Sequence, residues 1–139
     1  MKKFLIILLV LVIGAGLAYF LLMNNSPQEP AIEDPQYLSY SESLYSDLIG
    51  NNKPFTLFFY DSNDEALKTL RQSLKDDIEN YPIGSKIIEV DFGVDTEIQN
   101  QYEVTEAGVF ISINSKGKVI ETFSSVDVEE IKTAVSSSL

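Results

Sequence analysis

Residues 55–60 read FTLFFY, a run of apolar and aromatic residues interrupted only by Thr56. Such a run is typical of a strand that is covered by helices on both faces of a sheet, because neither side of the strand then meets water. The turn DSNDE follows at 61–65, where Ser62 and Glu65 fit a capping box at a helix start. The stretch therefore predicts a central strand that leads into a helix.

The residues after this turn carry an apolar stripe at helical spacing, formed by Leu67, Leu70, Leu74, Ile78 and Tyr81. Pro82 and Gly84 end the pattern, and KIIEVD at 86–91 predicts a second strand. Two strands that are joined through a helix should be parallel and connected by a right-handed crossover.

The remaining segments complete an α/β pattern. Apolar positions 44, 45, 48 and 49 predict a first helix that Gly50 can end, and residues 96–102 predict a short helix capped by Asp95. Strands at 109–114 and 119–123 flank the tight turn 115–117, which requires them to be antiparallel. Asp127 should cap a last helix. The order predicts a mixed sheet with helices on both faces, and it leaves open an extra edge strand before the first helix.

The N-terminal segment predicts attachment to a membrane. Lys2 and Lys3 precede the apolar residues from Phe4 to Met23, which as a helix would span about 30 Å, the thickness of a bilayer core. No further Lys or Arg occurs before Lys53, so the N-terminus should be cytoplasmic and the rest extracytoplasmic. A cleaved signal peptide, with secretion of the remainder, stays open as the alternative. A lipid-modified cysteine is excluded, because the chain has none.

Three parts follow from this pattern. Residues 1–23 form a cytoplasmic stub and an anchor (or signal peptide), residues 24–36 form a proline-rich acidic linker, and residues 37–139 form the domain. Beyond the apolar segment the chain carries 21 acids and 8 bases, a net charge of −13. A domain of this charge repels nucleic acid and anionic lipid head groups as a whole.

The chain contains neither cysteine nor histidine. This composition excludes thiol nucleophiles, disulfides, zinc sites built from these residues and catalytic triads that need histidine. We expect no cofactor and no bound metal.

Three segments together resemble the thioredoxin-like fold, and the resemblance covers about residues 37–139. They are KPFTLFFYDSNDEALK at 53–68, KIIEVDF at 86–92 and QYEVTEAGVFISINSKGKVIETF at 101–123. The chain is most similar to envelope-anchored bacterial members of that family. The resemblance implies a three-layer thioredoxin-like fold.

The resemblance also shows what this sequence lacks. The two cysteine positions of the family's C-x-x-C motif fall on Asp64 and Leu67, the buried acid of the central strand falls on Phe58, and the cis-proline falls on Gly108. The residues therefore do not support thioredoxin-type oxidoreductase activity, and we expect a redox-inactive, non-enzymatic domain.

In the family, extended peptides dock between the redox turn and the cis-proline loop, and the resemblance implies a groove there. The candidate residues are Tyr60, Asn63, Asp64, Glu106, Ala107 and Val109. Phe110 is expected in the core. Three functions remain open: a protein- or peptide-binding module of the envelope, an accessory subunit of a thiol-redox or secretion system, and a structural tether. The partner and the oligomeric state are not predicted.

Two other activities have weak patterns. Asp61, Asn63 and Glu65 alternate as in a calcium-binding loop, but Ala66 stands where that loop needs glycine and Gln72 where it needs glutamate. Acid pairs at 76–77 and 129–130 could suggest a hydrolase, yet they are typical of the solvated face of a helix.

Overall fold

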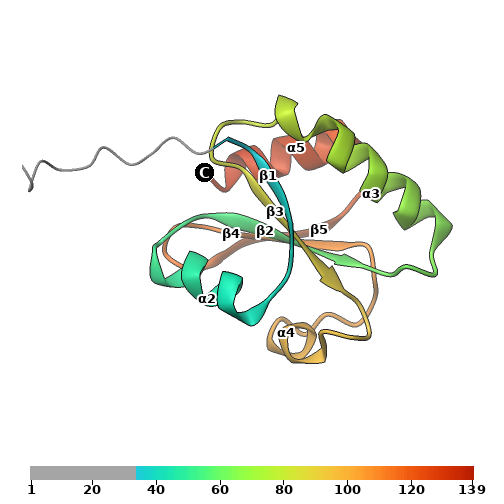
Figure 1. Ribbon diagram of the computed structural model, residues 1–139, viewed down its shortest axis with the longest axis horizontal. Helices are drawn as coiled ribbons and strands as arrows, with labels where there is room; N and C mark the ends of the chain where they lie inside the picture. The colour runs from blue at the N-terminus through green and yellow to red at the C-terminus, as the bar shows by residue number, and fades with distance from the viewer. Residues whose placement is uncertain (1–33) are drawn as a thin grey trace, which may run out of the picture. The chain divides into compact units, whose positions relative to one another are not determined.

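Five strands form one mixed sheet in the order β1-β3-β2-β4-β5 in the computed structural model of the chain (Figure 1). The strands are β1 Gln36–Ser39, β2 Phe55–Tyr60, β3 Lys86–Asp91, β4 Val109–Ile113 and β5 Val119–Ser124. The structure describes residues 34–139, so the predicted anchor from Phe4 to Met23 and most of the predicted linker lie outside the described residues. Within 34–139, every helix is too short or too polar to cross a bilayer.

The pairing of the strands confirms the sequence-based topology. β2 and β3 are parallel across their helical connection, with Phe58 opposite Glu89. β2 and β4 are antiparallel, and the predicted β4–β5 hairpin pairs Val109 with Ser124. The sequence did not decide whether an edge strand precedes the first helix. The structure has one, β1, which runs parallel to β3.

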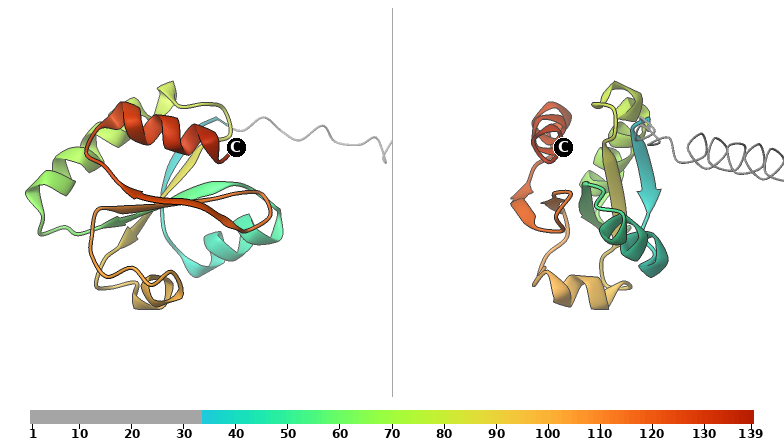
Figure 2. Two further views of the ribbon diagram at one scale, coloured as in Figure 1. Left: turned by 180° about the vertical axis from the view of Figure 1, so that it is seen from behind. Right: turned by 90° about the vertical axis from the view of Figure 1, so that its left-hand side faces the viewer.

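The helices cover both faces of the sheet, as Figure 2 shows. They are α2 Glu42–Gly50, α3 Glu65–Asp77, α4 Thr96–Gln101 and α5 Val128–Ser137, with a short 3-10 turn, η1 Ile78–Asn80, after α3. α3 and α5 pack with Phe58 and Phe110 on one face, whereas α2 and α4 pack with the alternate residues of β2 on the other. All six residues of β2 are buried, so the two cores meet at this strand.

Two predicted helix boundaries differ in the structure, and a third agrees. α2 ends at Gly50 as expected, with Asn51 as its C-cap, and Asn52 beyond it adopts a left-handed φ of +53° while Lys53 N donates to Leu48 O at 2.9 Å. α3 ends at Asp77, so Tyr81 lies beyond the helix although its ring is buried as expected. Asp95 occupies the N-cap position of α4, but its carboxylate accepts from Asp91 N and not from the helix.

The strand directions give the domain two ends. β1, β2 and β3 all begin at one end, which we call the proximal end, and the β4–β5 turn also lies there because Phe55 pairs with Ile113. At the opposite, distal end lie the turn after β2, the start of β4 and the finish of β5. Six residues of strand separate the two ends by about 20 Å.

Candidate functional site

The start of α3 forms one wall of the candidate site at the distal end. The N-cap is Asp64, whose Oδ1 accepts from Ala66 N at 2.8 Å and from Leu67 N at 3.1 Å. The predicted cap at Ser62 is therefore wrong. The Asp61 carboxylate accepts from Asn63 N at 2.8 Å, which holds residues 61–63 in a turn and delays the helix by two residues. Glu65 pairs with Lys68 at 2.6 Å and does not reach back as a capping box requires.

The loop before β4 forms the facing wall. Gly108 N donates to Phe59 O at 2.7 Å, and Gly108 has a φ of +84°. A Cβ at this position would lie 3.3 Å from Leu67 Cδ2, which is tighter than ordinary contact. The two degenerate positions Leu67 and Gly108 therefore lie side by side, and both the close approach of Leu67 and the positive φ favour glycine at position 108.

A groove of about 460 Å³ lies between these two walls. Its lining comes from Asp64, Ala66 and Leu67 of the α3 start, from residues 106–108, and from residues 124–126 after β5. The lining is mainly apolar, and it includes the two acidic residues Asp64 and Glu106. The arrangement suits a segment that buries an apolar side chain and presents positive charge beside it.

The six predicted groove residues divide into two sets. Asp64, Glu106 and Ala107 line the groove. The other three do not: Tyr60 is only 7% exposed and belongs to the core, Asn63 is exposed and bonded to Asp61, and Val109 packs toward the core of the α2/α4 face. Phe110 is fully buried and stacks on Phe58 with ring centroids 4.5 Å apart, as expected of a core residue.

Residues 124–126 line the groove but were missed in the sequence. Val126 is 73% exposed, although it is a large apolar residue beside an apolar hollow. The register of the β4–β5 hairpin could have indicated their position. Because Val109 pairs with Ser124, the residues that follow β5 must lie beside the loop that precedes β4.

The surroundings of the groove are strongly acidic. Five carboxylates belong to the two walls and to the residues that flank them: Asp61, Asp64, Glu65, Glu106 and Asp127. The nearest base along α3, Lys68, is bonded to Glu65. An approaching cationic segment would therefore meet attraction, and an anionic one repulsion.

Glu89 lies on β3 opposite Phe58, the residue that replaces the family's buried acid. Its carboxylate accepts from Tyr37 Oη and Arg71 Nε, each at 2.7 Å, and its side chain is 12% exposed. Burial opposes ionisation, but the bonds from Arg71 and Tyr37 and the charge of Arg71 outweigh it, so the pKa of Glu89 lies below its ordinary value. Burial first, and then the bond to Glu89, raise the pKa of Tyr37. This network joins α3 to β1 and β3, away from the groove.

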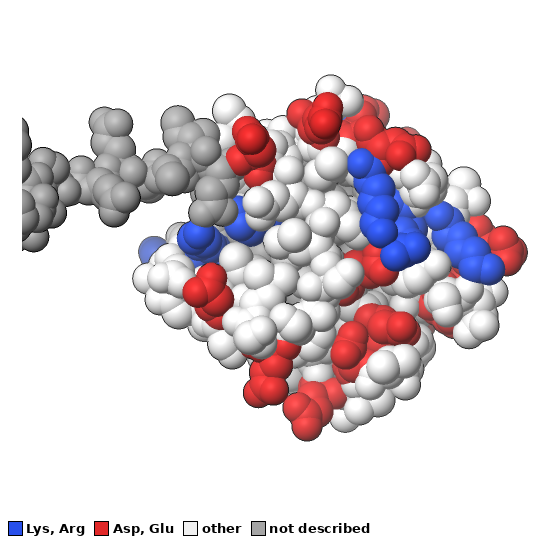
Figure 3. All heavy atoms as spheres, viewed as in Figure 1, with Lys and Arg blue, Asp and Glu red and all other residues white. Residues whose placement is uncertain are grey.

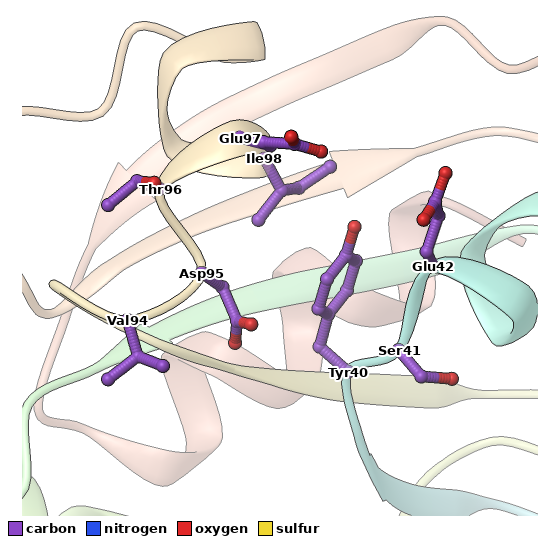
Figure 4. A pocket seen from close by; sticks show the side chains of 8 residues that line it. All are labelled: Tyr40, Ser41, Glu42, Val94, Asp95, Thr96, Glu97 and Ile98. Atoms are coloured by element: carbon purple, nitrogen blue, oxygen red, sulfur yellow. The ribbon is translucent and has the colours of Figure 1, made fainter.

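A second hollow of about 390 Å³ lies between the starts of α2 and α4 (Figure 4). The Tyr40 ring stands between Asp95 and Glu42, and burial, followed by these two carboxylates, raises the pKa of Tyr40. Asp95 already accepts from Asp91 N. Nowhere in residues 34–139 do three or more His, Cys, Asp or Glu side chains gather so that they could hold a metal ion.

Comparison with solved structures identifies the architecture. The chain superimposes on Trxlp of Edwardsiella tarda EIB202 with a TM-score of 0.63 at 12% identity, covering 72% of this chain and 98% of that one. The fold is thioredoxin-like. The reduced Schistosoma mansoni thioredoxin pre-protein matches with a TM-score of 0.62 at 19% identity, covering 75% of this chain and 99% of that one. Spinach chloroplast thioredoxin f matches with a TM-score of 0.64 at 11% identity, covering 79% of this chain and 98% of that one. No protein family model matches the sequence, and no curated protein does.

This thioredoxin-like domain thus keeps the architecture without its thiols. No residue of the chain is cysteine, so the chain contains no group that could exchange disulfides at positions 64 and 67.

Proposed function

We propose that the chain is a membrane-anchored, extracytoplasmic, redox-inactive thioredoxin-like domain that binds a protein or peptide segment in its distal groove. The bound segment has an apolar side chain with Lys or Arg next to it. The proposal places the anchor at residues 4–23 and assigns no enzymatic activity to the domain.

The observation that carries this proposal is the groove itself, in which Leu67 and Gly108 meet where the redox positions fall. An extended segment can bind there through main-chain hydrogen bonds, which need no thiol. Val126, which also lines the groove and is exposed, offers apolar contact area to such a segment.

The charge around the groove selects among segments. Asp64 and Glu106 line the groove, and neither forms an ion pair with a residue in the described part of the chain. A cationic side chain on the ligand would provide that partner, and it would also speed the encounter.

The test is photo-crosslinking in living cells with the full-length chain, which keeps its own anchor and compartment. A photoreactive residue replaces Glu106 in one variant, and Asn100, which is exposed on α4 across the sheet, in the control. One discrete adduct at 106 that is absent at 100 supports the proposal, and mass spectrometry then identifies the bound segment. Equal adducts at both positions, or none at 106, contradict it.

A further inference from the structure

The described part of the chain begins at the proximal end, which is the end opposite the groove. Gln36 N donates to Ser85 O at 2.9 Å, so the start of β1 lies beside the turn before β3. A Cβ on Gly84 in that turn would lie 3.9 Å from Leu139 Cδ2, so the C-terminal residue lies there as well. The β4–β5 turn belongs to the same end.

Exposed apolar side chains concentrate at this proximal end. The described residues expose six large apolar side chains, and four of them are proximal: Ile83 at 61%, Val119 at 47%, Ile120 at 45% and Leu139 at 49%. Val119 and Ile120 are the first residues of β5, and Ile83 lies in the turn before β3. These four side chains give one end of the domain apolar area that a partner surface could cover.

Basic residues concentrate there too, although the domain is acidic. Topology places four of the eight bases of residues 34–139 at the proximal end, and five of the nineteen acids. The bases are Lys53, Lys86, Lys116 and Lys118, of which Lys86 is buried, and the acids are Asp34, Asp47, Asp76, Asp77 and Glu79. Figure 3 shows the blue side chains in two groups, over α3 and at the side where β2 begins. Lys116 and Lys118 are exposed, and their ammonium groups form no ion pair with any residue in 34–139.

We propose that the proximal face, formed by Ile83, Lys116, Lys118, Val119, Ile120 and Leu139, docks on a bilayer surface that contains anionic lipids. The inference rests on the membrane anchoring in the proposed function. The lysines would approach lipid phosphates while the aliphatic side chains enter the interfacial layer, a combination typical of proteins that lie on a membrane.

The length of chain before the domain favours this occupant. Ten residues, 24–33, separate the predicted anchor from Asp34, and fully extended they would span at most about 36 Å. With the proposed anchor in the bilayer, Asp34 and the proximal face where it joins the domain lie within about 36 Å of the bilayer surface.

The net negative charge of the domain does not prevent this docking, because charges act locally in salt. The screening length is about 8 Å at physiological ionic strength, whereas the acidic surroundings of the groove lie about 20 Å from the proximal face. Local charge thus decides the orientation, and the domain would hold its groove away from the bilayer and open to a partner.

The experiment uses the full-length chain in lipid nanodiscs, and the absence of cysteine makes single-site labelling clean. A fluorophore is attached after I120C or, as the matched distal control, after V126C, and nitroxide lipid head groups act as quenchers. Quenching at position 120 in phosphatidylglycerol discs, without quenching at 126, is the expected result. Neutral phosphatidylcholine discs, or the added changes Lys116→Gln and Lys118→Gln, should abolish it, while Lys68→Gln should not.

Other results would overturn the inference. Equal quenching at both positions, no quenching at 120, or quenching that ignores lipid charge each contradicts docking on anionic lipid. In lipid-free detergent, the label at position 120 could instead become buried as the protein concentration rises. That result would identify a second copy of the chain as the occupant of the face. A chain that fails to co-elute with the discs refutes the anchor and this inference together. A chain that co-elutes without quenching refutes only the docking and leaves the groove function standing.

Discussion

Leu67 packs against the bare backbone of Gly108, so closely that a Cβ on Gly108 would lie 3.3 Å from Leu67 Cδ2. The resemblance to the redox family puts a cysteine at the first of these positions and a cis-proline at the second. Here an aliphatic side chain and a glycine close the groove floor. The contact explains how the groove keeps its shape without the residues that perform the chemistry.

The first prediction concerns this contact. Gly108→Ala should destabilise the fold, since alanine in the left-handed region costs about 1–2 kcal/mol and crowding against Leu67 adds about 1 kcal/mol. Gly93→Ala is the matched control, because Gly93 has a φ of +90° and open space around its Cα. Urea unfolding of the full chain in detergent, followed by tyrosine fluorescence, measures both changes. Equal losses for the two variants would show that the contact with Leu67 is not tight.

The second prediction concerns the cap of α3. Asp64→Ala should lower the free energy of unfolding by about 0.5–2 kcal/mol, because Ala66 N and Leu67 N lose their acceptor. Asp64→Asn should retain most of the stability, since asparagine also caps a helix. Ser62→Ala should change stability by less than about 0.5 kcal/mol. A large effect at Ser62 in the same unfolding measurement would restore the capping box that the sequence suggested.

The architecture could be predicted from the sequence because its signals were local. The six-residue run at β2, the stripe on α3 and the tight turn at 115–117 each specify an element and, together, the strand directions. The N-cap at Asp64 could not be predicted, because Ser62 and Asp64 both have capping side chains. The Asp61–Asn63 bond decides between them, and it exists only in the folded turn.

The groove could be predicted only in part, for a related reason. Asp64, Glu106 and Ala107, which the resemblance indicated, line the groove. The resemblance did not show that Tyr60 turns into the core under the Arg71 guanidinium, 5.0 Å from its ring centroid. Nor did it include Val126, whose position depends on pairing between residues far apart in the chain.

The third prediction concerns pH. The folded-state pKa of Glu89 lies below its ordinary value, so the folded chain binds fewer protons there than the unfolded chain, and the stabilisation is present above the unfolded pKa. It is lost as pH falls below the ordinary value and through the lowered pKa of the folded state. Glu89→Gln should cost about 1–3 kcal/mol at neutral pH, because Arg71 and Tyr37 lose a charged acceptor.

The pH dependence of this variant provides the check. Unfolding of the parent chain and of Glu89→Gln, measured from neutral pH into acid, should give free energies that converge as pH falls. Glu121→Gln is the control, because Glu121 is an exposed glutamate on β5 that takes no part in this network. A constant difference between parent and variant across the acid range would contradict the lowered pKa of Glu89.

The fourth prediction concerns the two redox positions. Asp64→Cys with Leu67→Cys should form an intramolecular disulfide under mild oxidation, because these positions face each other at the helix start as in a C-x-x-C motif. The mid-helix pair Gln72→Cys with Lys75→Cys has the same spacing and should remain mostly reduced. Thiol alkylation followed by gel shift measures both, and a reduced pair at 64 and 67 would show that the motif is misplaced.

The most direct test of the central claim is the affinity of the full-length chain in nanodiscs for designed extended peptides. One peptide carries a central leucine flanked by lysines, and its partners replace the lysines with glutamates or the leucine with serine. Only the first peptide should bind, and Asp64→Asn with Glu106→Gln should weaken that binding about tenfold, or by about 1.4 kcal/mol. The distant pair Asp47→Asn with Glu97→Gln should leave the affinity unchanged. Equal affinity for the lysine and glutamate peptides, or an affinity that ignores Asp64 and Glu106, would contradict the account.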